Sequence, residues 1–257
     1  MSEESTFKAS LMKRLNRGRV WQASWIWDDT KGSQRNRFVL FRTSIEPPAA
    51  TAALQLHISA DTRYRVWVDG RFVGRGPVQS QPYHQFYDSY DLPQAEGDRI
   101  EIAVEVYHVG MLPHALGGLI AEIEADGEVL SATGDDWLCM PGLAWQQETL
   151  HFDMNRVHPY QEHFDAQRLA PTWTTCRCDE LSYPWRPATS HKGDEDNHEP
   201  TGLPWTALRP RPIPYMESET VCAQSIVEIA EQQQIITRTR PGDISVSLSA
   251  ATRPIEK

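Results

Sequence analysis

The sequence predicts an all-β protein whose main part is a jelly-roll-like antiparallel β-sandwich. Two observations carry this prediction. Short apolar runs recur from Trp21 onward with turn-forming residues between them, a pattern typical of sandwiches and barrels rather than of alternating helices and strands. Two Asp-Gly pairs each lie between strand-like runs. With 257 residues, the chain is long enough for one large sandwich or two small domains.

Seven segments of the first half are expected to form strands. They are residues 37–44, 52–59, 64–68, 71–74, 100–107, 119–124 and 128–132. Asp69-Gly70 and Asp126-Gly127 supply the positive φ that a type I′ hairpin turn requires, so strands 64–68 and 71–74, and strands 119–124 and 128–132, are expected to form hairpins.

The segment 63–68 alternates strictly, which indicates a strand with one face toward the core. Its alternation places Tyr64, Val66 and Val68 on one face and Arg63, Arg65 and Trp67 on the other. Trp67 is therefore expected to lie beside two arginines on the face away from the core.

The remaining sequence predicts three regions. Residues 1–20 are polar and basic and are expected to form an N-terminal arm, and residues 21–203 the sandwich. Residues 204–257 are expected to form a linker and the strand-rich start of a second β-domain. The prolines of 204–214 exclude a central strand and favour an extended segment that packs across a surface. Segments 225–229, 234–238 and 244–248 are strand-compatible.

Composition excludes several function classes. The formal net charge of -10 argues against nucleic acid as a partner, because binding to phosphates relies on Lys and Arg. We expect no membrane partner, because no apolar run is long enough to span a bilayer, and no apolar stretch follows the basic N-terminus, so a cytoplasmic protein is expected. The four cysteines are expected to be reduced thiols, and Cys176-Arg177-Cys178 lacks the spacing of a zinc knuckle.

Several segments, in order, resemble the front end of bacterial α-L-rhamnosidases. They are Trp25-Ile26-Trp27, SADTRYRVWVDGRFVGRGP at 59–77, YDSYDL at 87–92, QEHFDAQ at 161–167 and PWTALRPRPIPYMES at 204–218. The sequence departs from the family pattern at Gln167, where Arg is usual, and at Pro171-Thr172-Trp173, where Gly usually precedes the Trp.

The resemblance implies a multidomain enzyme that hydrolyses terminal α-L-rhamnose by an inverting mechanism. In this family β-sandwich domains precede an (α/α)6 barrel that carries the acid and base carboxylates. We expect this chain to lack the barrel and to be a non-catalytic accessory region. The resemblance implies two partners, namely the barrel and a rhamnose-containing oligosaccharide or glycoside. A free-standing, lectin-like sugar-binding protein is the alternative.

A third hypothesis makes the chain an enzyme in its own right. Glycoside hydrolysis needs two carboxyl groups across a cleft, and Glu162 and Asp165 are the candidate pair. The competing interpretation is that both accept hydrogen bonds from backbone amides and hold a loop. His151, His158 and His163 lack further ligands at metal-binding spacing, so they are interpreted as core or solvated histidines.

A sugar site needs an aromatic platform and planar polar side chains. The segment 74–90 is rich in both, and its glycines and prolines are expected to hold its first half outside the sheet as a rim. The predicted ligand-binding residues are Trp67, Arg75, Gln79, Tyr83, His84, Glu162 and Asp165. In the alternative, Tyr87 and Tyr90 are core residues of a strand and Asp88 caps a turn. We expect no cofactor, and a structural calcium ion is the one metal left open.

Overall fold

A computed structural model of the chain describes residues 19–28, 35–48, 53–79, 85–93, 97–110, 116–134, 136–149, 160–180, 184–191, 204–205, 207–217, 229–240 and 243–253. The chain divides into two compact units between Ile213 and Pro214. The second unit contains one antiparallel hairpin, formed by β14 (Ile229–Arg240) and β15 (Asp243–Arg253). The three-region division predicted from the sequence stays a prediction.

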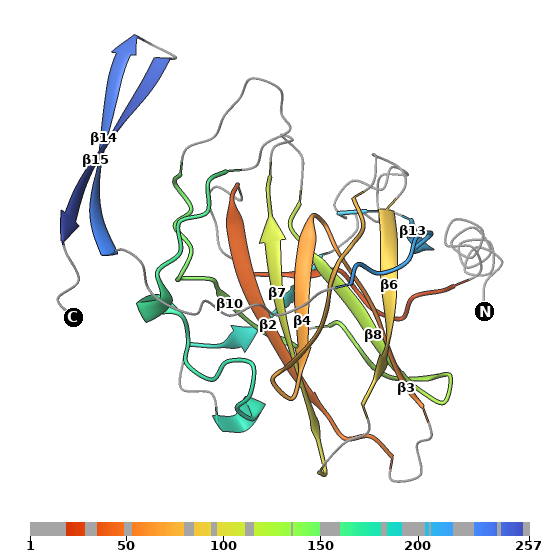
Figure 1. Cartoon of the computed structure of the whole chain (residues 1–257). Helices are drawn as coiled ribbons and strands as arrows, with labels where there is room; N and C mark the ends of the chain where they lie inside the picture. Colours follow the sequence, from red (N-terminus) through yellow and green to blue (C-terminus); the bar gives the residue numbers. More distant parts are fainter. Residues whose placement is uncertain are drawn as a thin grey trace. The chain divides into compact units, whose positions relative to one another are not determined.

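Two sheets build the first unit (Figure 1). One has the order β12-β1-β8-β3-β6-β13, with β9 also paired to β8. Its strands are β1 (Ile26–Trp27), β3 (Leu54–Ala60), β6 (Gln85–Leu92), β8 (Leu119–Ala125), β9 (Glu128–Ala132), β12 (Thr189–Ser190) and β13 (Leu208–Pro210). All of its pairs are antiparallel except β13 with β6, which is parallel.

The six-stranded sheet has the order β11-β10-β2-β7-β4-β5 and is antiparallel throughout. Its strands are β2 (Arg37–Ile45), β4 (Arg63–Val68), β5 (Arg71–Gly76), β7 (Ile100–His108), β10 (Leu138–Pro141) and β11 (Arg186–Pro187). The only helical elements among the described residues are the short 3-10 turns η1 (Ala166–Arg168) and η2 (Cys178–Glu180). The predicted all-β sandwich is confirmed.

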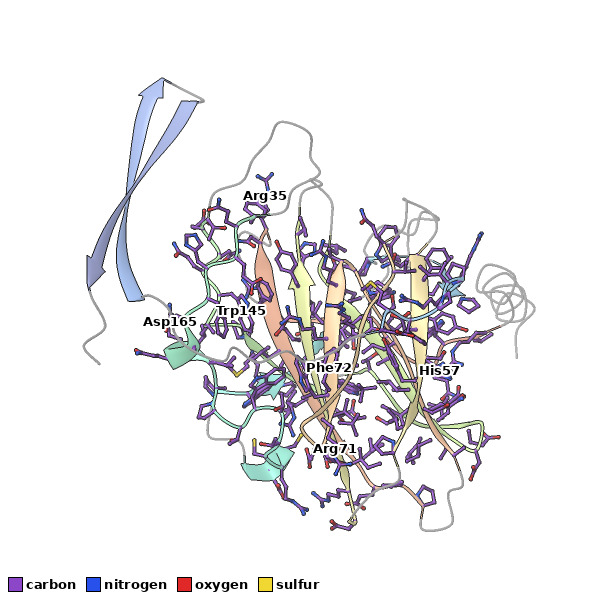
Figure 2. All side chains as sticks on the ribbon, in the orientation of Figure 1. Arg35, His57, Arg71, Phe72, Trp145 and Asp165 are labelled. Carbon is purple, nitrogen blue, oxygen red and sulfur yellow. The ribbon has the colours of Figure 1, made fainter. Side chains whose placement is uncertain are left out.

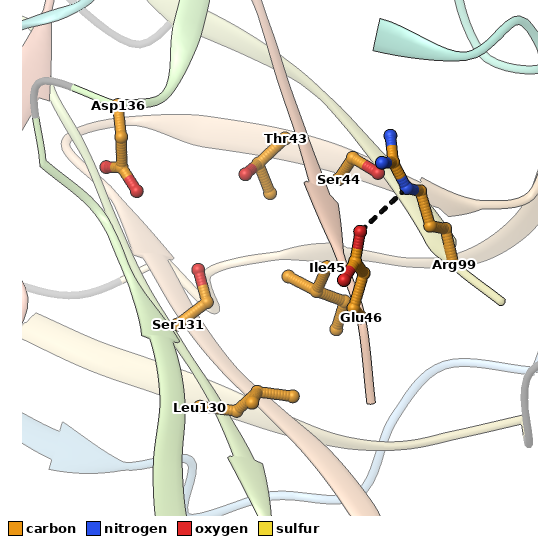
Figure 3. A pocket seen from close by; sticks show the side chains of 8 residues that line it. All are labelled: Thr43, Ser44, Ile45, Glu46, Arg99, Leu130, Ser131 and Asp136. Atoms are coloured by element: carbon orange, nitrogen blue, oxygen red, sulfur yellow. Dashed lines mark ion pairs between the residues drawn. The ribbon is translucent and has the colours of Figure 1, made fainter. Parts of the chain in front are cut away.

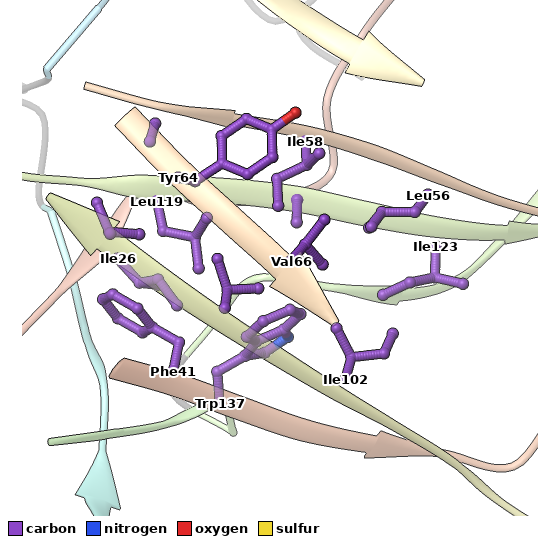
Figure 4. Packing of buried hydrophobic residues seen from close by; sticks show 14 of the residues in the cluster. Ile26, Phe41, Leu56, Ile58, Tyr64, Val66, Ile102, Leu119, Ile123 and Trp137 are labelled. Atoms are coloured by element: carbon purple, nitrogen blue, oxygen red, sulfur yellow. The ribbon is translucent and has the colours of Figure 1, made fainter. Parts of the chain in front are cut away.

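The core lies between the two sheets, as the packing in Figure 4 shows. Ile58 and Ile123 of one sheet and Val66 and Phe41 of the other are fully buried, and Trp137 fills the space beside them with no exposed surface. Full burial of an Ile or Phe side chain contributes about 1.5 to 3 kcal/mol. The middle of the sandwich is therefore a packed interior.

All seven strands expected in the first half are present, with ends shifted by no more than two residues. Both predicted hairpin turns are confirmed as well. Asp69 and Gly70 have φ of 48° and 75°, and Asp126 and Gly127 have φ of 51° and 88°, the left-handed pair that a type I′ turn requires. Tyr64, Val66 and Val68 are buried, so the predicted inward face of β4 is confirmed.

The prediction that glycines and prolines hold the first half of segment 74–90 outside the sheet is wrong at its start, and the second half is a strand. Gly74 and Gly76 lie within β5, and residues from Gln85 onward form β6. Tyr87 is buried in this strand, as the alternative interpretation expected. Asp88 does not cap a turn but lies buried in mid-strand, where it accepts hydrogen bonds from the Tyr64 hydroxyl and from Arg211 Nη1 at 3.0 Å.

The proline-rich segment at 204–214 joins the sandwich at a sheet edge through β13, beyond which no further strand is paired among the described residues. An edge position tolerates proline, which has no N–H for a second neighbour. Trp205 Nε1 donates to the Asp61 carbonyl at 3.1 Å, and the Trp205 carbonyl accepts from Trp25 Nε1 at 3.1 Å. Among the described residues, no helix is long and apolar enough to cross a membrane.

Candidate functional site

The outer face of the six-stranded sheet carries a row of charged side chains across three strands. Arg65 on β4 lies opposite Glu105 on β7 and opposite Arg75 on β5. Residues opposite one another in a ladder point to the same side, and the neighbours Tyr64 and Val66 point into the core. The row Arg75, Arg65 and Glu105 therefore points away from the core.

Aromatic rings flank this row on one side. Trp67 lies opposite Phe72 with ring centroids 5.8 Å apart, and it also makes an edge contact with Trp173 at 5.2 Å. Phe72 is 49% exposed, whereas Trp173, which belongs to the 160–180 segment, is buried. Figure 2 labels Phe72 near its chain neighbour Arg71. Phe72 is thus an exposed ring beside two arginines.

A second aromatic group lies on the other side of the row. Phe38 stacks on Tyr107 at 4.4 Å and on Trp145 at 4.6 Å, and Trp145 contacts Phe164 at 5.0 Å. The Trp145 indole donates from Nε1 to Glu162 Oε1 at 3.0 Å. This contact fixes Glu162 at the end of the stack.

Glu105 is a buried acid of this face. Its side chain is only 7% exposed, and its nearest described cation is Arg65, whose Nε lies 3.7 Å from Oε1. That separation is too long for a hydrogen bond. Burial raises the pKa of Glu105 to about 7; the positive charge of Arg65 opposes this rise and the negative charge of Glu162 adds to it. Burial likewise raises the pKa of Tyr107 to about 12.

Sequence reasoning did not select Glu105 as a site residue. The signal that could have found it is a glutamate at alternating positions within an otherwise apolar strand, since Glu101 and Glu105 alternate with isoleucine and valine. Such a pattern places carboxyl groups on the face of the strand that points away from the core. In this protein that outer face is covered as well. The residues that cover that face, within 143–149 and 160–176, come from a distant part of the chain.

Four predicted residues share this side of the sheet or the segment that covers it. Trp67, Arg75 and Glu162 lie as described above. Among the described residues Glu162 accepts from the Trp145 indole and from no backbone amide, contrary to the interpretation that it holds a loop through such amides. Asp165 does bond such an amide, because its Oδ1 accepts from Gln167 N at 3.0 Å and caps η1. Gln79 is exposed just after β5. Tyr83 and His84, like His151 and His158, lie outside the described residues.

A separate cavity of about 390 Å³ opens at one edge of the sandwich (Figure 3). Its lining residues are Thr43, Ser44, Ile45, Glu46, Arg99, Leu130, Ser131 and Asp136. They come from β2 in one sheet, from β9 in the other and from the segments that flank β7 and β10. Arg99 Nε lies 3.0 Å from Glu46 Oε1 at this cavity. None of the predicted site residues that the structure describes lines it.

Metal ligands and disulfides are not evident in the described part of the chain. No group of three or more His, Cys, Asp or Glu side chains is placed there to hold a metal ion. Cys139, Cys176 and Cys178 are not joined by disulfides. Burial raises the pKa of Cys178 to about 12, so this thiol is a poor nucleophile and metal ligand at neutral pH.

Comparisons with known proteins point to one enzyme class. The chain is similar to a GH78 family rhamnosidase of Bacillus sp. GL1, with 37% identity, a TM-score of 0.65, and coverage of 85% of this chain but 21% of that enzyme. An α-L-rhamnosidase from Dictyoglomus thermophilum shares the fold, with 17% identity, a TM-score of 0.54, and coverage of 86% of this chain and 25% of that one.

The α-L-rhamnosidase from Aspergillus terreus also shares the fold, with 17% identity, a TM-score of 0.52, and coverage of 66% of this chain and 21% of that one. No family model matches the sequence, and no curated protein matches it. The resemblance to α-L-rhamnosidases inferred from the sequence motifs is confirmed. The chain spans about a fifth to a quarter of the length of these enzymes.

Proposed function

We propose that this chain, which is similar to part of the GH78 rhamnosidase, is a non-catalytic, carbohydrate-associated β-sandwich region of an α-L-rhamnosidase-like glycoside hydrolase. The reaction of the whole enzyme is the hydrolysis of terminal α-L-rhamnose by inversion. A separate (α/α)6 barrel would supply the reacting carboxylates, and the substrate would be a rhamnose-containing oligosaccharide or glycoside.

One observation carries this proposal. The match reaches 37% identity over 85% of this chain, yet it accounts for 21% of the Bacillus enzyme. A relationship this close over nearly the whole chain, but over so little of the relative, is what a single region of a larger enzyme would show. The all-β fold of that region supports an accessory role, because the barrel of this family is helical.

The arrangement of the candidate acids also supports a non-catalytic role. Inverting hydrolysis needs one protonated and one ionised carboxyl group on opposite sides of a sugar, with space for water. Glu162 is bound to the Trp145 indole, and Asp165 caps a 3-10 turn. Glu105 has a raised pKa, but it lies buried on a sheet face behind Arg65. Each of these three carboxyl groups is therefore engaged or covered by a neighbour within the fold.

The experiment is an assay of the purified chain with an aryl α-L-rhamnoside, beside a full-length α-L-rhamnosidase as the positive control. We expect release of the aryl group at the rate of buffer alone. Turnover above that background by the wild-type chain, removed by Glu162→Gln but kept in Glu128→Gln, would overturn the proposal and make Glu162 a catalytic acid. Glu128 is an exposed residue of β9, so its substitution controls for loss of charge.

A further inference from the structure

We propose that residues 19–23 form a strap that acid releases from the outer face of the seven-stranded sheet, with His57 as the proton-sensitive group beneath it. The segment comes shortly before β1 and forms no strand of its own. Side chains of β3, β6 and β8 hold it, and these three strands are neighbours in the sheet. The strap goes beyond the proposed function, because it depends only on contacts within this chain.

One buried carboxylate anchors the strap. Glu122 lies on β8 with its side chain only 1% exposed, and Arg19 Nη2 donates to its Oε2. Glu122 Oε1 accepts from the backbone N–H of Gln22 and, at 2.9 Å, from that of Ala23. Donors of three strap residues therefore converge on a single ionised group. Hydrogen bonds to such a group are roughly twice as strong as neutral ones, so Glu122 is the main point of attachment.

A second carboxylate and two aromatic rings complete the attachment. Arg19 Nη2 also lies 2.7 Å from Glu124 Oε1, so this cation bridges two acids of β8. Its guanidinium lies 4.8 Å from the ring centroid of Trp21 and 5.9 Å from that of Tyr87, and the two rings meet edge to face at 5.3 Å. Arg19 is therefore the cation that balances two neighbouring carboxylates and packs on the rings beside them.

His57 is a titratable group that shares the same acids (Figure 2). It lies on β3 opposite Glu122 and is 7% exposed. Its Nε2 lies 3.3 Å from Glu124 Oε2, and its Nδ1 lies 2.7 Å from Ser89 Oγ on β6. A protonated His57 would add a second positive charge to acids that Arg19 already balances.

The surroundings of His57 keep its ring neutral while the strap is closed. The charged and titratable groups that face it are Arg19 of the strap, Glu122 and Glu124 of β8, and Tyr87 of β6, whose ring is 6.0 Å away. Burial lowers the pKa of His57 below its ordinary value of 6.5, and the charge of Arg19 lowers it further, against the opposing effect of the two glutamates. Release of the strap exposes the ring and takes Arg19 away. The released state therefore binds the proton more tightly than the closed state.

This difference fixes the sign of the pH dependence. Above pH 6.5 His57 is largely neutral in both states, and the strap is held at full strength. As pH falls below this value, the released state takes up the proton first, so acid favours release. Burial raises the pKa of Glu124, but the hydrogen bond and charge of Arg19 lower it by more. Protonation of Glu124 at still lower pH therefore acts in the same direction.

Two backbone amides report on the strap directly. Hydrogen exchange of the Gln22 and Ala23 amides, which both donate to Glu122, is measured at about pH 7.5 and about pH 5.5 and corrected for the intrinsic exchange rate at each pH. We expect their protection to fall about tenfold at the lower pH, the change that one pKa unit between the two states produces. The Ser24 amide is the internal control, because it donates to the Thr133 carbonyl at 2.9 Å and should keep its protection.

Variants assign the effect to His57. His57→Gln keeps a hydrogen-bonding side chain but takes up no proton, so the two strap amides should be equally protected at both pH values. Arg19→Gln should leave these amides about tenfold less protected at both. His191→Gln is the matched control and should respond as the wild type does. His191 is another histidine whose pKa is lowered by burial, but its Nε2 lies 2.7 Å from the Gly117 carbonyl rather than beside an acid.

A second measurement follows the ring of His57 itself. Its pKa, measured by NMR titration, should be higher in Arg19→Gln than in the wild type, because the variant removes the cation and loosens the cover. Thermal melts show whether each variant keeps the fold. Four outcomes would overturn the strap: protection that does not change with pH, an equal fall in His57→Gln, an equal fall at Ser24, or the same His57 pKa in Arg19→Gln and the wild type.

Discussion

Arg42 and Glu101 form a buried ion pair on the outer face of the six-stranded sheet, with Arg42 Nη2 2.8 Å from Glu101 Oε2. The Arg42 side chain has no exposed surface. Its guanidinium also donates to the backbone carbonyls of Trp173 and Cys176. One cation therefore joins β2, β7 and the segment that covers this face of the sheet.

The first prediction concerns this cation. Arg42→Met should lower the free energy of unfolding by about 3 to 5 kcal/mol, because it leaves the Glu101 carboxylate buried without its cation. The double variant Arg42→Met/Glu101→Gln should lose less free energy of unfolding than Arg42→Met alone, because no unpaired carboxylate is left buried. Arg177→Met is the control, since Arg177 is 40% exposed and pairs with exposed Asp98 and Asp179 at 3.6 to 3.7 Å. Urea denaturation should show that Arg177→Met lowers the free energy of unfolding by no more than about 1 kcal/mol.

The second prediction concerns the pH dependence of stability and follows from the raised pKa of Glu105. The pKa of this carboxyl is 4.5 in the unfolded chain, whereas burial raises it to about 7 in the folded chain. Between these values the folded state binds more protons than the unfolded state, so stability falls as pH rises. This contribution is fully present below about pH 4.5 and is lost by about pH 7, and it amounts to at most about 3 kcal/mol.

Glu105→Gln removes that pH dependence. The stability of the variant relative to the wild type should increase from pH 4.5 to pH 7 and stay level above pH 7, as measured by urea denaturation at each pH. Glu128→Gln, at an exposed position of β9, should show no such trend. If the two variants follow parallel curves, Glu105 does not titrate near pH 7 and is in contact with water in the folded chain.

The sequence predicted the regular strands well and the polar interior poorly. β2, β3, β7 and β8 were found because their apolar runs and turn residues are local signals. β6 was predicted only as the alternative, because a carboxylate such as Asp88 in the middle of a run argues against a buried strand. The Asp88 carboxylate is satisfied by Tyr64, 24 residues earlier in the chain, and by Arg211, 123 residues later.

The candidate sites were predicted only in part for a similar reason. Trp67 and Arg75 were found because they belong to the well-marked hairpin at 63–76. The cavity was missed because its lining comes from β2, β9 and the separate residues Arg99 and Asp136, which no spacing rule connects. β13 was missed because its prolines exclude a central strand but permit an edge strand.

The third prediction uses the same buried Asp88. A Cβ at Gly76 would lie 1.9 Å from Asp88 Oδ2 and 2.9 Å from the Tyr64 hydroxyl oxygen. Gly76→Ala must therefore displace a buried carboxylate from its partners, at a cost of about 1 to 3 kcal/mol or more. Gly97→Ala meets no atom within 4 Å and should cost little. Equal urea midpoints for the two variants would contradict the buried network.

The last prediction compares the two type I′ turns. Gly70 and Gly127 occupy the same turn position with φ of 75° and 88°, so alanine at either site adopts a left-handed conformation that costs roughly 1 kcal/mol. Their surroundings differ. A Cβ at Gly127 meets nothing within 4 Å, whereas a Cβ at Gly70 would lie 2.3 Å from Thr175 Cγ2 in the segment that covers the sheet.

Gly127→Ala should therefore be destabilised only by the left-handed backbone conformation. Gly70→Ala should be destabilised by the same conformation and, in addition, by the displacement of the 171–176 turn. The double variant Gly70→Ala/Thr175→Ser removes the methyl group in question and should recover most of the difference, because Cγ2 is the only side-chain atom closer than 3.4 Å. Thermal melts of the three variants measure this. If Thr175→Ser does not relieve Gly70→Ala, the covering segment does not rest on the hairpin, and the contact between them is not part of the folded state.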